Sequence, residues 1–365
     1  MDIDIKEYKC PNCGGAVKFD SSIQKMKCPY CDTEFEISAL QEYQKETETP
    51  AQDRFAWAAE DGAMKAWGSN ELGDLSTGAC PSCGAELVGD NNTLAMVCPC
   101  CGNAQIVQKR VQGMLKPDYV IPFKLEKKAA VEALKNFYQG KRLLPNFFKE
   151  ENRVNSIQGV YLPFWLFDAR ARGHICYRTT KTSSWSDNNY DYTKTDYYSV
   201  VRDGSINFEK IPVDGSEKMD DSYMDAIEPF DYAHIKDFQS AFLAGYMAEK
   251  YDVDVQASKE RAGRRIKTTV ETEFAKTVTG YSSVTTESST VDVEGGKVSY
   301  ALFPVWILNS KYKNENYQFI MNGQSGRLAG RLPADPGKSW KYRLLFTGIF
   351  GAAFTLVIQL LRIFL

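Results

Sequence analysis

Cys10-Pro11-Asn12-Cys13-Gly14, followed by Cys28-Pro29-Tyr30-Cys31, decides the fold of the N-terminal third of the chain. Four cysteines recur with the same spacing seventy residues later, as Cys80, Cys83, Cys98 and Cys101. Two residues between paired cysteines let both sulfurs reach one ion, and the glycine after the first pair lets the backbone turn. The fourteen residues between the pairs suit one β-hairpin. The sequence therefore predicts one small β module, a zinc ribbon, used twice.

Zinc is the cofactor that these cysteines favour, with two structural ions per chain. Four thiolates suit tetrahedral Zn²⁺ and leave no position for water, which argues against a catalytic metal. A module of about thirty residues buries too little surface to fold unaided, and metal binding of about 10–16 kcal/mol supplies what its core lacks. The alternative is two sets of buried thiols without metal. By symmetry with Tyr30, Cys100 should not be a ligand, and Cys176 lies far from both sets.

The charge of the ribbons argues against nucleic acid as their partner. Residues 1–50 contain six lysines and ten acidic residues, and residues 78–108 contain two acidic residues and no lysine or arginine. Binding to phosphates needs a surplus of basic residues, so recognition of proteins is the better interpretation. The acidic N-terminus has no apolar run typical of a signal peptide, and reduced thiols also indicate the cytoplasm.

A long apolar segment predicts one transmembrane helix at residues 343–365. Leu344 to Leu361 contains no charged residue, and the segment to Leu365 would measure about 33 Å as a helix, against a bilayer core of about 30 Å. The alternative is a buried helix of a soluble domain. Basic residues precede the segment and only Arg362 follows, so the positive-inside rule predicts a single-pass protein whose N-terminal bulk is cytoplasmic. The preceding basic residues are Arg327, Arg331, Lys338, Lys341 and Arg343.

The middle of the chain predicts an α+β domain with an antiparallel sheet at 116–335. The other expected parts are zinc ribbon 1 (1–40), a polar linker with a helix near 52–67 (41–77) and zinc ribbon 2 (78–110). Expected strands are 117–123, 159–177, 284–293, 298–309 and 317–321, with a hairpin in 196–213 around Asp203-Gly204 and a second turn at Gly295-Gly296. A polar loop is expected at 179–195. Helices are expected at 126–138, 220–228 and over most of 238–279, with a break near Asp252.

Two strands of this domain share a pattern: Pro163 to Arg172 parallels Pro304 to Lys313. In both, the face that carries the tryptophan stays apolar or small, while the other face changes from apolar to basic. The simpler interpretation is a pair of core strands that emerge into solvent. The alternative is a basic, partner-binding stripe for an acidic protein or lipid headgroups, formed by Arg170, Arg172, Lys311 and Lys313.

Nothing in the sequence indicates catalysis. Gly337-Lys338-Ser339 resembles the end of a phosphate-binding loop, but the required earlier glycine is Leu332. No G-x-S-x-G, H-E-x-x-H or G-x-G-x-x-G motif occurs. His174 and His234 are the only histidines, and both are interpreted as structural. An enzyme with an unrecognised central site remains a third hypothesis, and a deep pocket with perturbed titratable groups would favour it.

The order of several motifs resembles one family. The paired ribbons are followed by Val120-Ile121-Pro122-Phe123, Tyr161-Leu162-Pro163-Phe164-Trp165, Phe303-Pro304-Val305-Trp306 and Asn322-Gly323-Gln324-Ser325-Gly326, ahead of an apolar tail. This resembles bacterial membrane-anchored proteins with transcription-factor-IIB-type zinc ribbons, some of which carry a primosomal-helicase label. No ATPase motif supports that label here. The resemblance covers most of the chain.

The resemblance implies a function as well as a fold. Similar proteins are partners of phage-shock protein A and of a membrane-associated SPFH-domain protein. The expected function is therefore a non-enzymatic adaptor or scaffold of the envelope-stress type, which recruits partner proteins to the cytoplasmic face of the membrane. The alternative is a membrane-tethered nucleic-acid-binding protein in replication or transcription, which needs a basic surface.

Overall fold

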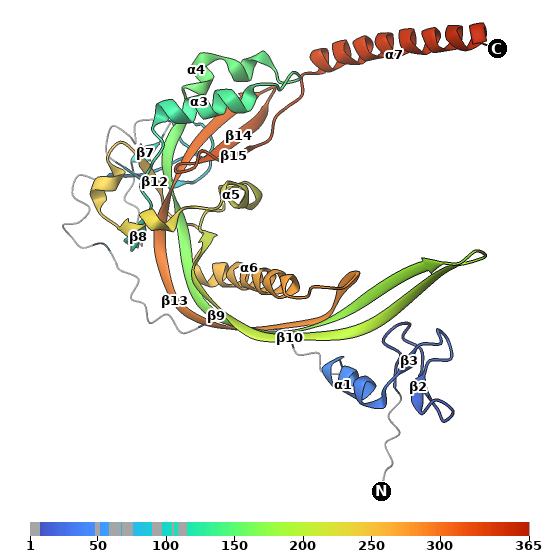
Figure 1. The fold of residues 1–365 in the computed structure, drawn as a ribbon. Helices are drawn as coiled ribbons and strands as arrows, with labels where there is room; N and C mark the ends of the chain where they lie inside the picture. Colours follow the sequence, from blue (N-terminus) through green and yellow to red (C-terminus); the bar gives the residue numbers. More distant parts are fainter. Residues whose placement is uncertain are drawn as a thin grey trace. The chain divides into compact units, whose positions relative to one another are not determined.

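The computed structural model describes residues 8–47, 52–57, 67, 76–89, 97–103, 106–108 and 115–364. It has two N-terminal groups of four cysteines, a central α+β part with a mixed sheet and a long apolar C-terminal helix, which confirms the predicted fold class. The chain forms two compact units. Unit 1 comprises Met1–Asp61, Phe167–Ile211 and Lys259–Val298, and unit 2 comprises Gly62–Leu166, Pro212–Ser258 and Ser299–Leu365. Three long strands contribute to both units: β9 (Gln158–Ser186), β10 (Asp191–Asp214) and β13 (Ser283–Tyr312) (Figure 1).

The first module of unit 1 is a small antiparallel sheet with one helix. The sheet contains β1 (Lys18–Asp20), β2 (Lys25–Lys27) and β3 (Glu34–Phe35), and α1 (Ile37–Thr47) follows it directly. Leu40 of α1 is buried with Val17, Cys10 and Cys28 of this module. This packing explains why residues 41–47 are helical, although their polar composition predicts a linker.

The rest of unit 1 is a layer of long strands with a helix on one face. β10 pairs with β9, β9 with β13, and β13 with the short parallel strand β4 (Arg54–Ala56). From α6 (Val255–Lys276), Ile266 and Val270 pack in one core with Ala171 of β9 and Val291 of β13. The predicted helix at 52–67 is therefore wrong at 54–56, where β4 lies. Residues 52, 53, 57 and 67 are not helical either, and the remainder of that prediction lies outside the described residues.

Two predicted turns are wrong because their glycines serve close packing inside strands. β13 continues through Gly295 and Gly296. A Cβ atom at Gly295 would lie 2.2 Å from a ring carbon of Trp57, so only glycine fits there. β10 likewise continues through Gly204, which faces the ring of Phe274. The β9–β10 turn lies at 187–190, so most of the loop predicted at 179–195 is strand.

Unit 2 is built around a mixed sheet. Its further strands are β5 (Ser76–Ala79), β6 (Glu86–Gly89), β7 (Val107–Gln108), β8 (Tyr119–Val120), β11 (Lys236–Asp237), β12 (Met247–Glu249), β14 (Glu315–Asn322) and β15 (Leu328–Gly330). Short strands break the predicted antiparallel pattern, because β12 runs parallel to β9 and β8 runs parallel to β13. The second cysteine module is part of this sheet, since β6 pairs with β12.

Both faces of the sheet in unit 2 are covered. Its helices are α3 (Lys127–Tyr138), α4 (Glu151–Val154) and α5 (Asp221–Ile227), with 3-10 turns at Asn146–Lys149, Tyr232–His234 and Ser240–Leu243. Trp306 and Leu308 pack with α3 and α4, whereas Val305 and Ile307 pack with α5 and the second cysteine module. Helices α3 and α5 match the predicted ones. The helix predicted over 238–279 forms only as α6, after β12.

The chain ends in α7 (Pro336–Phe364), which starts seven residues before the predicted membrane segment. Asp335 precedes Pro336 and accepts hydrogen bonds from the backbone of Lys338 and Ser339, as a helix cap does. The Lys338 Nζ donates to the Leu144 carbonyl at 2.7 Å and to Asn146 Oδ1 at 2.7 Å, which fixes the first turn to unit 2. Pro336–Gln359 is long and apolar enough to cross a membrane, with a mean hydropathy of 1.4, and its most apolar part is not buried.

Candidate metal centres

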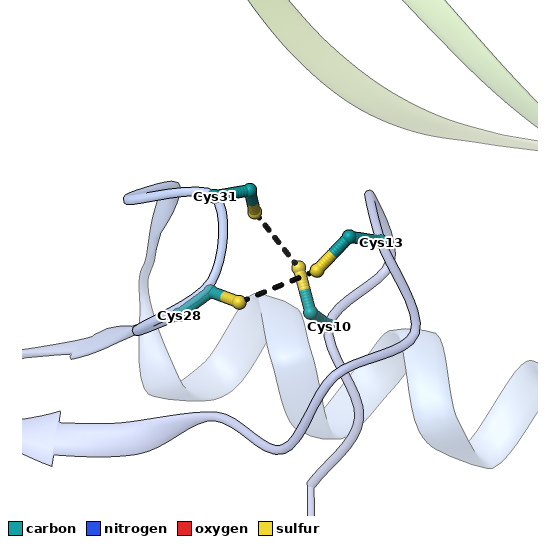
Figure 2. A group of neighbouring side chains, drawn as sticks. All are labelled: Cys10, Cys13, Cys28 and Cys31. Atoms are coloured by element: carbon teal, nitrogen blue, oxygen red, sulfur yellow. Dashed lines mark hydrogen bonds between the residues drawn. The ribbon is translucent and has the colours of Figure 1, made fainter.

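The first centre brings four sulfurs together from two turns of the ribbon. The Sγ atoms of Cys13 and Cys28 lie 3.4 Å apart, and those of Cys10 and Cys31 lie 3.6 Å apart (Figure 2). All four lie within 4.8 Å of one another. Zn–S bonds of about 2.3 Å in a tetrahedron place sulfurs about 3.8 Å apart, whereas a disulfide needs about 2.05 Å. The geometry therefore fits a metal ion.

Backbone hydrogen bonds shape both turns of this first centre. The Gly14 N–H donates to the Cys10 carbonyl at 2.8 Å, and the Asp32 N–H donates to the Cys28 carbonyl at 2.9 Å. Both donors have left-handed backbone angles, with φ of +74° at Gly14 and +57° at Asp32. Glycine adopts this conformation without steric cost, and aspartate tolerates it better than most residues. Each turn therefore places its two cysteine side chains on the same side of the backbone, where both sulfurs can bind one ion.

The electrostatics of the first centre favour a thiolate at the partly exposed Cys31. The Thr33 hydroxyl lies 3.1 Å from Cys31 Sγ and stabilises its ionised form, which lowers the pKa of Cys31 to about 6. Burial acts the other way on Cys10 and raises its pKa to about 12. A bound cation stabilises thiolates and overcomes such a burial cost.

The second centre repeats the same geometry inside unit 2. Cys80 and Cys101 have Sγ atoms 3.6 Å apart, and those of Cys83 and Cys98 are 3.8 Å apart. Gly84 and Gly102 again take left-handed angles, with φ of +74° and +76°. All four sulfurs lie within 4.8 Å of one another, so these residues could also hold one ion. The chemistry of both donor sets, four cysteine sulfurs each, fits zinc.

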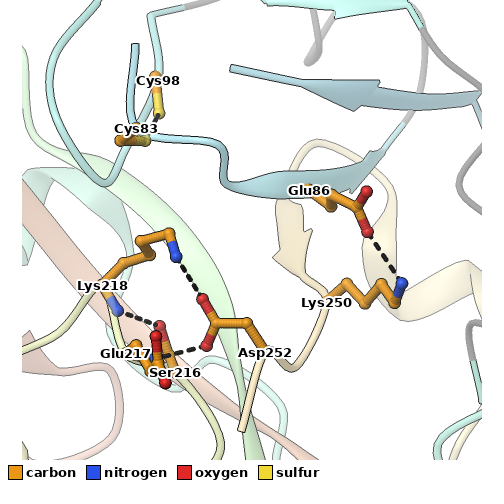
Figure 3. A network of polar contacts seen from close by, with 8 residues as sticks. All are labelled: Cys83, Glu86, Cys98, Ser216, Glu217, Lys218, Lys250 and Asp252. Carbon is orange, nitrogen blue, oxygen red and sulfur yellow. Dashed lines mark hydrogen bonds and ion pairs between the residues drawn. The ribbon is translucent and has the colours of Figure 1, made fainter. Parts of the chain in front are cut away.

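The second centre is joined to the core of unit 2, whereas the first centre lies in a small sheet of its own. The Asn309 side-chain amide donates to the Pro99 carbonyl, and the Gln318 amide donates to the Cys100 carbonyl at 3.2 Å. An ion pair also links β6 of this module to the residue after β12, since Lys250 Nζ lies 2.8 Å from Glu86 Oε2 (Figure 3). Cys80 and Cys98 belong to the main hydrophobic cluster of the unit. Sequence reasoning missed these two amides, because their targets are backbone carbonyls.

Cys100 packs beneath the second centre. Its side chain is buried in the same cluster, and its thiol hydrogen bonds to Cys98, which lowers the pKa of Cys98 to about 5. The same bond and burial raise the pKa of Cys100 well above its usual range. Cys100 is not part of the four-sulfur group, as its alignment with Tyr30 predicted.

Glu249 is a buried carboxylate that sequence reasoning missed. It lies on β12 and is 1% exposed, and the side chains of Ser216 and Cys100 lie near its carboxyl group. Burial, assisted by Asp252, raises the pKa of Glu249 to about 8. The nearby Lys218 is instead bound to Asp252, with 2.6 Å between Nζ and Oδ2 (Figure 3). Glu249 is therefore mostly protonated in the folded protein at pH 7.

Replacing Glu249 by glutamine is expected to remove a pH-dependent loss of stability. In the unfolded chain the carboxyl titrates near 4.3, so the folded state binds more protons between about pH 4.3 and 8. The wild-type protein should lose on the order of a few kcal/mol over that window, with the loss complete above about pH 8. Urea unfolding of the zinc-loaded protein at pH 6 and pH 9 measures this loss. The exposed Glu217→Gln variant is the control, and equal pH slopes in all three proteins would contradict the prediction.

The other predicted residues belong to both units. Arg170 and Arg172 are exposed in unit 1, and Lys311 and Lys313 are exposed in unit 2. Both interpretations of these four residues stay predictions. His174 Nδ1 lies 3.1 Å from Asp203 Oδ2 in unit 1. His234 Nε2 lies 3.4 Å from Asp231 Oδ2 in unit 2.

The comparisons identify one relative over nearly the whole chain. No protein-family model matches the sequence, and no solved structure matches it. The protein named Uncharacterized protein YdjG of Bacillus subtilis (strain 168) is 33% identical over 352 residues, which cover 96% of this chain and 96% of that protein. This similarity includes the long strands as well as the cysteine modules. The chain therefore belongs to the family of B. subtilis YdjG.

Proposed function

We propose that this protein is a non-enzymatic, membrane-anchored adaptor whose zinc-stiffened first ribbon binds partner proteins at the cytoplasmic face of the membrane. The observation that carries the proposal is α7, which is exposed at every position from 343 to 359 and carries no charged residue from Leu344 to Gln359. Phe350 and Phe354 are 70% and 67% exposed. A helix that is apolar all round needs lipid or a protein cover, and its length suits lipid.

The two cysteine centres have different surroundings, which supports a stabilising role for the second and a partner-binding role for the first. The second centre is held by Asn309, Gln318 and the core of unit 2, so its metal would stabilise the fold. The first centre lies in its own sheet, and Cys13, one of its four cysteines, is exposed. A rigid, exposed module of this kind is suited to contact other proteins. The envelope-stress role rests on the resemblance alone.

A membrane-tethered nucleic-acid-binding protein is the second candidate function. It rests on the frequent use of zinc ribbons for nucleic acids, and the acidic ribbons weaken it. Gel-shift titration with single- and double-stranded DNA across salt concentrations tests this candidate. Tight, salt-sensitive binding would favour it over the adaptor.

Affinity capture tests the adaptor itself. The tagged full chain, extracted from membranes in mild detergent, should retain specific proteins that are identified by mass spectrometry. A Cys28→Ser variant should lose the metal of the first centre and these proteins, while it stays in the membrane through α7. Proteins retained equally by both chains, or none reproducibly retained, would contradict the proposal.

A further inference from the structure

The structure assigns a binding site at the base of the first ribbon: we propose that a cavity beside Glu287 takes an arginine or lysine side chain of a partner protein. The site lies within unit 1 and deepens the proposed adaptor function by giving the chemistry of the partner. The cavity measures about 110 Å³ and lies between α1, β3 and the long strands. A cavity of about 560 Å³ adjoins it and shares Tyr43, Arg178 and Glu287. The pair of cavities offers a slot for one side chain and room for the backbone that carries it.

The walls of the slot are largely aromatic and apolar. Phe35, Leu40, Tyr43 and Tyr197 line it. Tyr197 is 41% exposed on β10, and Ser199, two residues on, shares its face of the strand. Tyr198, which also lines the slot, and Tyr281 already have a cation over them, since Lys181 Nζ lies 5.6 Å and 5.3 Å from their ring centres. Aromatic rings attract cations through their quadrupole, so these walls suit the stem and head of a basic side chain.

Glu287 supplies the counter-charge. Its Oε1 accepts a hydrogen bond from the Tyr43 hydroxyl at 3.0 Å and lies 3.5 Å from Arg178 Nε. Its Oε2 is buried and has no hydrogen-bond partner among the described residues. A buried acceptor without a donor is costly, and a charged donor satisfies it best. Arg178 does not interact with Glu287 alone, because its Nη1 donates a hydrogen bond to the Pro11 carbonyl at 3.0 Å.

The net charge of residues 1–50 favours a cation over an anion at the slot. Arg178 and Lys9 are the basic residues that line the two cavities, and Glu287 is the acidic one. Cys10 and Cys13 of the first centre line the larger cavity, and four thiolates around one Zn²⁺ carry two formal negative charges. With zinc bound, the lining carries three negative charges against the two of Arg178 and Lys9, and Lys181 over Tyr198 adds one more positive charge. Residues 1–50 are acidic in total, which attracts a basic partner segment.

Titration with short peptides tests the site in the zinc-loaded full chain in detergent micelles. The probes are Gly-Arg-Gly capped at both ends and the same peptide with neutral citrulline, followed by ¹⁹F NMR of fluorotyrosine-labelled protein. Variants that replace single tyrosines assign the resonances of Tyr43 and Tyr197. The arginine peptide should shift both resonances in a saturable manner, and the citrulline peptide should bind at least tenfold more weakly. Capped Gly-Lys-Gly should shift the same resonances.

Two variants and one control make the test specific. Glu287→Gln should weaken binding of the arginine peptide at least tenfold, and Tyr197→Leu should weaken it while Glu287 is kept. Glu294→Gln, the same charge change at an exposed position of β13, should leave binding unchanged. Each variant is tested only when it holds two zinc ions per chain. If Glu287→Gln loses zinc, the peptide affinity of Tyr197→Leu decides whether the proposal stands.

Three outcomes would overturn the proposal: no saturable shift with arginine, equal binding of citrulline, or unchanged binding in the variant that decides. Tetramethylammonium shifting the resonances more strongly than arginine would instead indicate a lipid or small-molecule cation. The failure of this test differs from the failure of the adaptor proposal. Partners could be captured through another surface although no peptide enters this slot, and arginine could bind here although no partner is captured.

Discussion

Cys98→Ser is expected to leave one zinc ion per chain and to abolish the cooperative unfolding of unit 2. Cys98 is 1% exposed and lies in the main hydrophobic cluster of that unit with Cys80. A structural zinc site contributes about 10–16 kcal/mol, whereas a whole domain is stable by about 5–15 kcal/mol. Loss of this ion therefore removes stabilisation comparable to the entire stability of the unit. Elemental analysis gives the zinc content, and hydrogen exchange gives the extent of unfolding.

Two matched cysteine variants separate the metal from the thiol. Cys100→Ala removes the neighbouring buried thiol and should keep two zinc ions, with only a packing loss of about 1–3 kcal/mol. Cys28→Ser should also leave one zinc ion, but faster hydrogen exchange should be confined to the first ribbon, around residues 8–47. Unit 2 protected equally in Cys98→Ser and wild type would contradict the structural role of the second centre.

The cysteine centres were the most predictable part of this molecule, because the spacing of a few nearby cysteines is enough to identify their metal ligands. Cys10 to Cys31 and Cys80 to Cys101 come together through tight turns that need only a few residues each. The position of α3 was also predictable, since its apolar spacing is local. The attachment of the second ribbon to unit 2 was not, because it depends on Asn309 and Gln318, more than two hundred residues away along the chain.

The length of the strands could not be predicted for a related reason. Gly204 and Gly295 look like turn residues in the sequence, yet each faces an aromatic ring from a distant segment. Tertiary contacts thus give these glycines a packing role that local propensity does not reveal. Glu287 is similar: nothing in Thr285-Thr286-Glu287-Ser288 indicates a functional residue. Its position beside Tyr43 of the first ribbon makes it the base of a slot.

A pair of arginines in α7 is expected to release the chain from the membrane without disturbing its folded units. Phe350→Arg with Phe354→Arg places two charges in the middle of the apolar segment, where each costs about 2.5–3.5 kcal/mol for insertion into a bilayer. Both phenylalanines are more than 60% exposed, so the substitutions break no packing in unit 2. The protein should move from the membrane pellet to the soluble fraction, and it should keep two zinc ions.

The matched control is Phe350→Leu with Phe354→Leu, which keeps the segment apolar and should stay in the pellet. Washing membranes with alkaline carbonate separates a spanning helix from one that docks on another protein, because carbonate strips peripheral proteins but leaves spanning ones. Wild type and the leucine variant should resist the wash. If carbonate released them, α7 would be covered by a protein rather than by lipid, since the exposed phenylalanines need an apolar cover in either case. The anchor in the proposed function would then be wrong, whereas both cysteine centres would stand.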